Sequence, residues 1–450
     1  MSGIRIPGTV QAVLQRLNEA GFAAFAVGGC VRDSLLGLPP KDWDICTAAR
    51  PEETAALFPR TLLTGAKYGT VTVLEPGGPF EVTTFRKEGD YEDSRHPEEV
   101  EFLPALEGDL SRRDFTVNAM AADREGNVTD LFRGREDLKS RILRCVGTSE
   151  TRFSEDALRI LRALRFASQL DFAVEEETGK ALIKLRSSLS AVAPERIHKE
   201  LVQLMQGPGA CRVLEEFAPV FAVIVPELEP CMGFDQHNFH HTKDVWGHTL
   251  AALREEKSGD ADLRLALLLH DIGKPAAFTL DENSTGHFYG HAEKSAELTD
   301  RILLRLRFDN AAREEITALV AMHHRIPEPM TRKAMSRLLG AHEERFVRKL
   351  LALRRCDALG TGTVLRADAE EEERQALALL EELLREKACL RIPDLSISGR
   401  DLLALGVPEG PEIGRILQGL LDAVLEEQVE NQKPALMEYA QQKLLQMKNN

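Results

Sequence analysis

The pattern of apolar and polar residues divides the chain near residue 150. Before this point, short apolar runs and two-residue alternation predict strands separated by turns and brief helices. The clearest case is a hairpin over 67–86, where β-branched residues alternate on both sides of Pro76-Gly77-Gly78. The other predicted strands lie within 24–27, 41–47, 114–123 and 128–132, and the predicted helices cover 8–20, 31–36 and a segment starting at Pro51.

After Thr151 the strand patterns nearly vanish and one helical pattern follows another. Residues 154–170, SEDALRILRALRFASQL, have a helical period, with Ser154 as N-cap and acidic residues in the first turn. We therefore expect an α+β protein, with an N-terminal α/β head containing a mixed sheet and an all-α remainder without tandem repeats. The expected boundaries are 1–150 for the head and 151–235, 236–365 and 366–450 for the helical parts.

Composition is that of a globular protein with reduced thiols. The 450 residues exceed one ordinary core, and 43% hydrophobic and 29% charged residues are typical of a soluble chain. There is no run of about 20 apolar residues and no signal-peptide pattern at the N-terminus. The seven cysteines are scattered singly without a C-x-x-C pair, which predicts neither disulfides nor a zinc framework. These features predict a cytoplasmic protein without a membrane partner.

The charge balance restricts the kind of nucleic acid that the chain could bind. The 57 Lys and Arg against 72 Asp and Glu give a net charge of −15, which argues against non-specific nucleic-acid binding. Residues 301–355 nevertheless contain 13 Lys and Arg against 6 Asp and Glu. This segment is either a set of solvated helix faces or a basic stripe that binds one RNA of defined shape.

The first candidate catalytic motif is Asp42-Trp43-Asp44. Residues two apart on a strand share a face, so Asp42 and Asp44 are expected on one side, with Trp43 and Ile45 in the core. Adjacent carboxylates repel unless a divalent cation binds both. Nucleotidyl transfer uses such a pair to hold two Mg²⁺ ions. One lowers the pKa of the attacking 3′-hydroxyl, and the other neutralises the triphosphate and the leaving pyrophosphate. Glu81, on a neighbouring predicted strand, is placed to complete the site, although a D-x-D motif alone is more commonly an exposed turn.

A glycine pair precedes this motif. Gly28 and Gly29 lack Cβ atoms, so their amides and the N-terminus of the following helix can approach phosphate groups closely. Arg32 would add a charged, forked donor to the same oxygens. A Gly-Gly pair alone usually marks a turn, and the ordered set of motifs is the stronger observation.

Three sequence blocks in order carry a family resemblance. They are GGCVRD with DWD, then DLSRRDFTVNAMA, then EDALRILRALRFA. Together they resemble class II of the CCA-adding enzyme and bacterial poly(A) polymerase superfamily, over roughly residues 22–205. The resemblance implies Mg²⁺ binding by Asp42 and Asp44, triphosphate contacts by Gly29 and Arg32, and ribose contacts, which select a ribonucleotide, by Arg113 and Asp114.

The same resemblance implies that Asp156 and Arg159 act as an amino-acid template for the base. The two are three residues apart and thus on one face of the predicted helix. An acceptor beside a planar donor fork matches the Watson–Crick edge of cytosine or adenine, whereas guanine and uracil present the wrong order. Arg162 and Arg165 continue the row and could meet phosphates. On pattern alone, the alternative is a helix with arginines on its solvated face.

Two further segments match the same family. Residues 86–97 are polar and resemble a flexible loop that CC-only enzymes of the family lack, so its presence favours an enzyme that can also add A. His96 departs mildly from the Arg-Arg-Pro that the family usually has there. Pro194 opens a segment that resembles the family's neck helix, for which we expect a structural role.

Histidines and aspartates spaced along the helical part form a second constellation. Their order, H…HD…H…H…D, resembles the HD phosphohydrolase superfamily. An adjacent His and Asp at a helix end can bind one metal, and mixed ligands of this kind suit Mn, Fe, Ni, Co or Mg, with a metal-bound water for hydrolysis. Isolated histidines are more often packed or surface residues, but the set in register favours a metal site. The candidate ligands are His248, His270, Asp271, His291, His323 (with His324 beside it) and Asp357.

Some bacterial CCA-adding enzymes look similar in carrying such a domain after the neck, which implies hydrolysis of 2′,3′-cyclic or terminal phosphates. Gln236-His237-Asn238 and His241 could line the same cleft. Residues 395–417 form a helix–turn–helix-like unit that resembles the tRNA-holding tail of the family, and a glycine-rich helix connection is the alternative.

These observations predict a template-independent enzyme that adds C, C and A to tRNA 3′ ends from CTP and ATP. We expect Mg²⁺ in the head and a divalent transition metal or Mg²⁺ in the HD-type site. Four alternatives stay open: a poly(A) polymerase, an A-adding enzyme that needs a CC-adding partner, a metal phosphohydrolase whose head only binds RNA, and a non-catalytic tRNA-binding protein. The acidic balance and the lack of a long basic tail favour one shaped RNA partner. The oligomeric state is left open.

Overall fold

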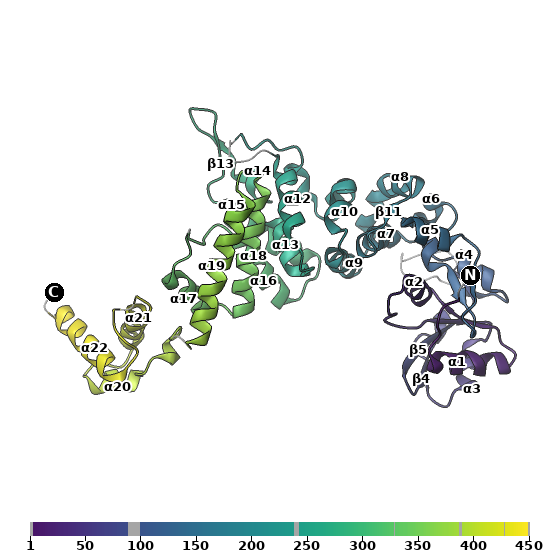
Figure 1. Ribbon diagram of the computed structural model, residues 1–450, viewed down its shortest axis with the longest axis horizontal. Helices are drawn as coiled ribbons and strands as arrows, with labels where there is room; N and C mark the ends of the chain where they lie inside the picture. Colours follow the sequence, from purple (N-terminus) through teal and green to yellow (C-terminus); the bar gives the residue numbers. More distant parts are fainter. Residues whose placement is uncertain are drawn as a thin grey trace. The chain divides into compact units, whose positions relative to one another are not determined.

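The computed structural model of this chain separates into two compact units (Figure 1). Unit 1 comprises Met1–Glu229 with Arg305–Phe308, and unit 2 comprises Pro230–Leu304 with Asp309–Asn450. The expected division into four parts stays a prediction. The structure describes residues 3–88, 100–237, 243–327, 329–386, 389–426 and 428–448.

A seven-stranded mixed sheet lies at the centre of the head. Strands β5 and β2 are parallel, and every other neighbouring pair in this sheet is antiparallel. The hairpin of β4 and β5 buries Val71 and Val73 on one strand and Phe80 and Val82 on the other, as the alternating pattern predicts. In sheet order the strands are β3 (Thr61–Leu62), β4 (Thr70–Glu75), β5 (Gly78–Thr84), β2 (Ile45–Thr47), β1 (Ala24–Val27), β8 (Met120–Ala122) and β9 (Val128–Asp130).

Helices pack around this sheet and then make up the rest of unit 1 (Figure 1). Short strand pairs accompany them: β6 (Arg86–Glu88) with β7 (Val100–Phe102), and β10 (Ile142–Leu143) with β11 (Ala173–Val174). The head helices are α1 (Gly8–Glu19), α2 (Gly29–Leu35), α3 (Pro51–Leu57), α4 (Leu106–Ser111) and α5 (Gly134–Ser140). The following helices are α6 (Ser149–Glu155), α7 (Leu158–Gln169), α8 (Glu176–Leu185), α9 (Pro194–Gln206), α10 (Ala210–Glu216) and α11 (Ala218–Ile224).

Unit 2 is almost entirely helical, apart from the short pair β12 (Thr279–Leu280) and β13 (Gly286–His287). Its last three helices pack on one apolar cluster that includes Leu402, Leu420 and Leu436. The helices are α12 (Val245–Glu255), α13 (Ala261–Leu269), α14 (Lys274–Ala277), α15 (His291–Arg305), α16 (Asn310–Met322), α17 (Arg332–Ala341), α18 (Glu344–Gly360), α19 (Arg366–Arg385), α20 (Gly399–Ala404), α21 (Pro411–Leu425) and α22 (Lys433–Lys448).

The mixed sheet followed by helices confirms the predicted fold class. Two strand predictions in the head were too long. The strand expected over 41–47 begins only at Ile45, and Trp43 is half-buried rather than in the core. Within 114–123, residues Thr116–Asn118 form a 3₁₀ turn, so only the last part of the segment is extended.

The single helix expected over 154–170 is also wrong. The chain forms two helices, α6 and α7, because Asp156 has an extended backbone with φ −144°. Ser154 therefore lies in the last turn of α6 and does not cap α7. In the described part of the chain, none of the helices combines the length and the hydrophobicity that a membrane crossing needs. The polar loop expected over 86–97 lies outside the described residues from position 89 onward.

Candidate functional site

Three carboxylates of the head gather at the start of β2. The hydrogen bond from Val27 N to Asp44 O, 2.9 Å long, extends the strand pairing by one residue beyond β2. In the parallel pair Ile45 stands opposite Val82, so Asp44, just before β2, and Glu81, in β5, are neighbours. The structure thus brings Glu81 beside the aspartate motif, as the sequence predicted, although the motif precedes the strand.

The electrostatics of this group fit a divalent cation. The pKa of Asp44 is raised to about 6, first by partial loss of hydration and then by the negative charges of Asp42 and Glu81, while Arg113 opposes the rise. A cation bound among these oxygens would remove that repulsion, and hard oxygen ligands are those that Mg²⁺ prefers. The donor set therefore suits Mg²⁺.

The glycine turn beside this group allows a close approach of arginine. Gly28 has φ 83°, a backbone conformation that favours glycine, and a Cβ built there would lie 3.0 Å from Arg113 Nη1, so a larger residue would crowd that guanidinium. Arg32 follows in α2 and is 9% exposed. Its Nη1 donates to Asn118 Oδ1 at 2.7 Å, and its Nη2 lies 2.7 Å from Asp33 Oδ1. The guanidinium is therefore fixed before any ligand arrives.

A chain of hydrogen bonds links Arg32 to Asp114. Asn118 accepts from Arg32 and donates through Nδ2 to Asp114 Oδ1 at 3.2 Å. Arg162 donates to the other oxygen, Oδ2, from Nε at 2.9 Å and from Nη2 at 2.5 Å. Burial alone would raise the pKa of Asp114, but the charge and hydrogen bonds of Arg162, with that of Asn118, lower it to about 2. Asp114 therefore stays ionised at neutral pH.

This ion pair predicts a pH-dependent stability. Because the folded-state pKa of Asp114 lies below its ordinary value of 3.8, its carboxylate stabilises the fold above about pH 4, and this contribution is lost as the pH falls toward 2. The difference corresponds to about 2 kcal/mol. We expect Asp114→Asn to lose about that much unfolding free energy at pH 6 and clearly less at pH 3. Denaturant unfolding at both pH values measures this, and an equal loss at both would contradict the assignment.

The predicted template residues do not share a helix face. Asp156 Oδ1 accepts from Leu158 N at 3.0 Å, and its Oδ2 accepts from Arg196 Nη2 at 3.0 Å. Arg159, in α7 and 7% exposed, donates to Glu155 Oε2 at 2.5 Å. The expectation of one continuous helix is corrected: Asp156 ends α6, and each template residue is held by a neighbour of opposite charge.

The arginines expected to meet phosphates both bind carboxylates within unit 1. Arg162 holds Asp114, and Arg165 Nε donates to Glu200 Oε2 at 2.6 Å. Asn118, which joins Arg32 to Asp114, was not singled out from the sequence, although it lies in the DFTVNA block four residues after Asp114. Arg196, the partner of Asp156, gave no sequence signal beyond its place in the expected neck helix.

All six predicted ligands of the HD-type site converge in unit 2. His248 Nε2 of α12 lies 2.9 Å from Asp357 Oδ1 of α18 and 3.3 Å from Asp271 Oδ2. His270 Nε2, at the end of α13, lies 3.3 Å from the same two oxygens. His291 and His323 approach the other oxygen, Asp271 Oδ1.

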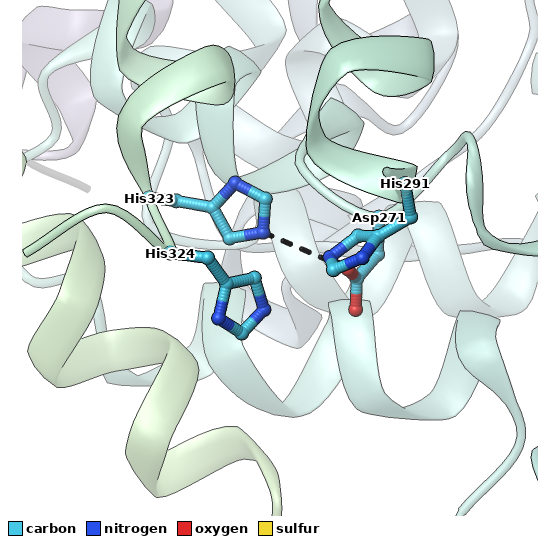
Figure 2. Close-up of side chains that lie close together, drawn as sticks. All are labelled: Asp271, His291, His323 and His324. Atoms are coloured by element: carbon cyan, nitrogen blue, oxygen red, sulfur yellow. Dashed lines mark ion pairs between the residues drawn. The ribbon is translucent and has the colours of Figure 1, made fainter. Parts of the chain in front are cut away.

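Figure 2 shows the second side of this cluster, where three histidines surround Asp271. His291 Nε2, from the start of α15, lies 3.5 Å from Asp271 Oδ1, and His323 Nε2, from the end of α16, lies 3.9 Å from it. The ligand atoms of Asp271, His291, His323 and His324 all lie within 4.8 Å of one another. His324 was noted only as a neighbour in the sequence, yet it joins this group.

The ring orientations suit metal binding. The Nδ1 atoms of His270, His291 and His323 lie 2.7, 2.8 and 2.6 Å from the carbonyl oxygens three residues earlier in the chain. A carbonyl only accepts, so each Nδ1 donates to it, and Nε2 of His291 and of His323 keeps a lone pair toward the cluster. Burial alone would lower the pKa of His270, but the carboxylates of Asp271 and Asp357 raise it to about 10, so in the absence of a cation the ring of His270 is protonated. Among the described residues, Nε2 of His291 and of His323 is buried without a hydrogen-bond partner. Burial and the nearby His270 lower the pKa of His323 to about 3, so its ring is neutral.

Of the cleft residues, Gln236 contacts the cluster indirectly. Its Oε1 accepts from Lys274 Nζ at 3.0 Å, and Lys274 Nζ lies 2.7 Å from Asp271 Oδ2. His237 has its ring beside Phe278, with centroids 5.9 Å apart. Asn238 and His241 lie outside the described residues.

The fold and the head site define a nucleotidyltransferase, and family models agree. Residues 24–144 match the model described as Poly A polymerase head domain. Residues 171–232 match Probable RNA and SrmB- binding site of polymerase A, and residues 291–440 match tRNA nucleotidyltransferase domain 2 putative.

Full-length relatives narrow this class. The chain is 34% identical over 427 residues to the CCA-adding enzyme of Geobacillus thermodenitrificans, covering 94% of this chain and 93% of that protein. It is 35% identical over 453 residues to that of Lactobacillus delbrueckii subsp. bulgaricus, covering 98% and 99%. The chain belongs to the family of CCA-adding enzymes, which confirms the resemblance seen in the sequence.

Other matches are consistent with this placement. The CCA-adding enzyme of Ligilactobacillus salivarius is 47% identical over 242 residues, which is 52% of this chain and 60% of that protein. Among solved structures, the Bacillus stearothermophilus CCA-adding enzyme in complex with CTP has a TM-score of 0.72 and 29% identity, covering 98% of both chains. The similarity in fold therefore extends over nearly the whole chain.

Proposed function

We propose that this chain adds C, C and A to the 3′ end of tRNA from CTP and ATP without a nucleic-acid template. The observation that carries the proposal is the set of three neighbouring carboxylates in the head, those of Asp42, Asp44 and Glu81. The chain that carries them aligns with a CCA-adding enzyme over 98% of its length. The relative solved in complex with CTP, 29% identical to this chain, supports CTP as a substrate.

In this proposal Asp42 and Asp44 hold Mg²⁺, with Glu81 beside them. Bound Mg²⁺ supplies charge neutralisation for the triphosphate and lowers the pKa of the attacking 3′-hydroxyl. Arg32 and the amides of the glycine turn bind the triphosphate, with Arg32 already oriented by Asn118. The protein thereby positions the phosphates in front of the carboxylates.

Selection of the nucleotide is assigned to four residues of the head and of the helices that follow it. Arg113 and Asp114 contact the ribose, and Asp156 with Arg159 reads the base. An ionised carboxylate accepts from the amino group of cytosine or adenine, while the guanidinium donates to the adjacent ring nitrogen. Uracil and guanine present a carbonyl where the carboxylate needs a donor, so they are rejected.

The experiment that tests this function supplies labelled CTP or ATP separately to tRNA that lacks its last three, two or one nucleotides. Incorporation of C on the two shorter forms and of A on the longest identifies a CCA-adding enzyme. Failure of C on every form, with A added to the longest, leaves an A-adding enzyme. Long A tracts on unrelated RNA would favour the poly(A) polymerase.

A second activity is proposed for the cluster in unit 2: metal-dependent hydrolysis of a phosphate ester at an RNA end. It is favoured by the buried Nε2 atoms of His291 and His323, which have no hydrogen-bond partner among the described residues, and by the two carboxylates beside them. Mixed nitrogen and oxygen ligands suit a divalent transition metal, which supplies a bound water of lowered pKa.

Replacing Asp271 by Asn should separate the two activities. The substitution removes a charge that lies within 3.5 Å of His248, His270 and His291, so metal affinity falls. We expect hydrolysis of tRNA ending in a 2′,3′-cyclic phosphate to fall at least about 100-fold, while nucleotide incorporation is unchanged. His287→Gln, which alters a histidine paired with Asp281 outside the cluster, is the matched control. Equal hydrolysis by D271N and the wild type would exclude this site.

A further inference from the structure

We infer that Asp109 is a positioning residue, which holds Arg113 in place for its contact with the ribose of the incoming nucleotide. This inference rests on the proposed function, in which Arg113 meets the ribose, and deepens it by naming the group that fixes this arginine. Asp109 opens the DLSRRDFTVNAMA block, in which the family resemblance assigned roles only to Arg113 and Asp114.

Asp109 is a buried carboxylate that two neighbouring arginines share. Its side chain, in α4, is 0% exposed. Oδ1 accepts from Arg112 Nε at 3.0 Å and from Arg112 Nη2 at 2.6 Å, and Oδ2 accepts from Arg113 Nη2 at 3.1 Å. Burial alone would raise the pKa of Asp109, but the charges and hydrogen bonds of the two arginines lower it. An ionised carboxylate shielded from water holds a guanidinium more firmly than a surface carboxylate does.

The helix that carries Asp109 packs against the strands that carry the candidate site. Leu110, the next residue, is fully buried in an apolar cluster with Val27 and Cys46. Val27 directly precedes the glycine turn, and Cys46 follows Asp44 by two residues. The carboxylate of Asp109 therefore belongs to the same packed frame as the turn and the catalytic carboxylates.

Arg113 extends from this frame toward the candidate site. A Cβ built on Gly28 would lie 3.0 Å from its Nη1, and its positive charge opposes the rise in the pKa of Asp44. Among the described residues, Nε of Arg113 is buried without a hydrogen-bond partner. Asp109 thus holds the guanidinium through Nη2, and an acceptor on the substrate, such as a ribose hydroxyl, would satisfy the buried Nε–H.

A purely structural role is the alternative for Asp109, because Arg112 donates to the same carboxylate from two nitrogen atoms. The carbonyl oxygen of Arg112 also accepts from Arg152 Nη1 at 3.2 Å, which ties the end of α4 to α6. The two roles differ in what their loss affects. A weakened fold impairs every nucleotide alike, whereas a displaced Arg113 impairs only nucleotides that offer it a 2′-hydroxyl.

The test compares CTP with dCTP on tRNA that lacks its last three nucleotides, with the full chain and Mg²⁺. Asp109→Asn keeps the size of the side chain but removes the charge that anchors Arg113. We expect the ratio of kcat/KM for CTP to that for dCTP to fall at least about tenfold, because a hydrogen bond from a charged donor is lost and dCTP never forms it. Continued incorporation of dCTP shows that the variant is folded.

Arg112→Gln is the matched control, since it removes the other partner of Asp109 and keeps the pair of Asp109 with Arg113. It should lower the stability measured by denaturant unfolding and leave the CTP to dCTP ratio unchanged. Arg113→Lys keeps the charge but removes the planar fork, and it should lower the ratio as D109N does. The double variant D109N/R113K should have the ratio of R113K alone, because both substitutions act through one guanidinium.

If D109N incorporates neither nucleotide, Asp109→Glu takes its place. This variant keeps the buried charge but moves the carboxylate by one methylene group, so the ratio should fall at least about threefold. An equal fall of kcat/KM for CTP and dCTP in the folded variants, or losses that add in the double variant, would overturn the inference and leave the ribose contact of Arg113 standing. An unchanged ratio in R113K would refute that contact and the inference with it.

Discussion

Replacing Asp42 by Asn is expected to reduce incorporation of both CTP and ATP by at least about 1,000-fold. The amide has the size of the carboxylate but no charge, so it is a poor ligand for Mg²⁺. Loss of several kcal/mol of metal-based stabilisation of the transition state corresponds to a factor of this order. Single-turnover incorporation on tRNA lacking its last nucleotide measures the effect.

The same variant is expected to be at least as stable as the wild type, although it loses activity. Asp42 and Glu81 raise the pKa of Asp44, which means that the three carboxylates repel one another without a cation. Removing one charge relieves this repulsion, so D42N should unfold at the same or a higher denaturant concentration than the wild type in the absence of Mg²⁺. The hydrolysis proposed for unit 2 should be unchanged in this variant.

A matched aspartate provides the control. Asp123 lies in the turn between β8 and β9, where its carboxylate accepts from Asn127 N and Nδ2 at 2.8 Å. Asp123→Asn should leave incorporation within about twofold of the wild type, consistent with a surface substitution. If D42N lost incorporation together with stability, Asp42 would be a structural residue, which would contradict the proposed Mg²⁺ site of the head.

The head could be predicted well because its signals are local. Period-two alternation placed the hairpin, and a glycine pair followed by a D-x-D motif marked the region in which the carboxylates gather. The position of Glu81 followed from strand pairing, and the parallel register of Ile45 with Val82 sets it beside Asp44. The alternation of apolar and polar residues could not predict where β2 begins, because only three residues of the strand expected over 41–47 form regular strand pairs.

The helix break at Asp156 could not be read from the sequence because its cause is distant. The apolar period continues through this position, which is why one helix was predicted over 154–170. The carboxylate instead pairs with Arg196, 40 residues further on, and accepts from Leu158 N at the start of α7. Tertiary contacts thus override the helical pattern. Likewise, spacing identified the histidines of unit 2 but not their division around the two oxygens of Asp271.

This local geometry leads to the second large effect, on nucleotide choice. Arg159→Lys keeps the charge but removes the planar fork, and Asp156→Asn keeps the shape but replaces half of the acceptor with a donor. A hydrogen bond to a charged group contributes roughly 1.5–3 kcal/mol, so each substitution should lower kcat/KM for CTP and ATP by about 10- to 100-fold. UTP and GTP, which do not make these bonds, should change little.

Discrimination between nucleotides is therefore the decisive quantity. We expect the ratio of kcat/KM for CTP to that for UTP to fall in both variants, measured with each nucleotide on tRNA lacking its last three residues. Arg186→Lys is the control, because this arginine donates to Ile183 O at 2.6 Å, away from the template pair. Arg159 also binds Glu155 at 2.5 Å, so the alternative explanation for a loss of activity is that Arg159 has a purely structural role. In that case kcat/KM for all four nucleotides would fall by the same factor, and the ratio would stay constant. A misplaced helix impairs every substrate alike, whereas a missing base contact affects only the nucleotides that form it.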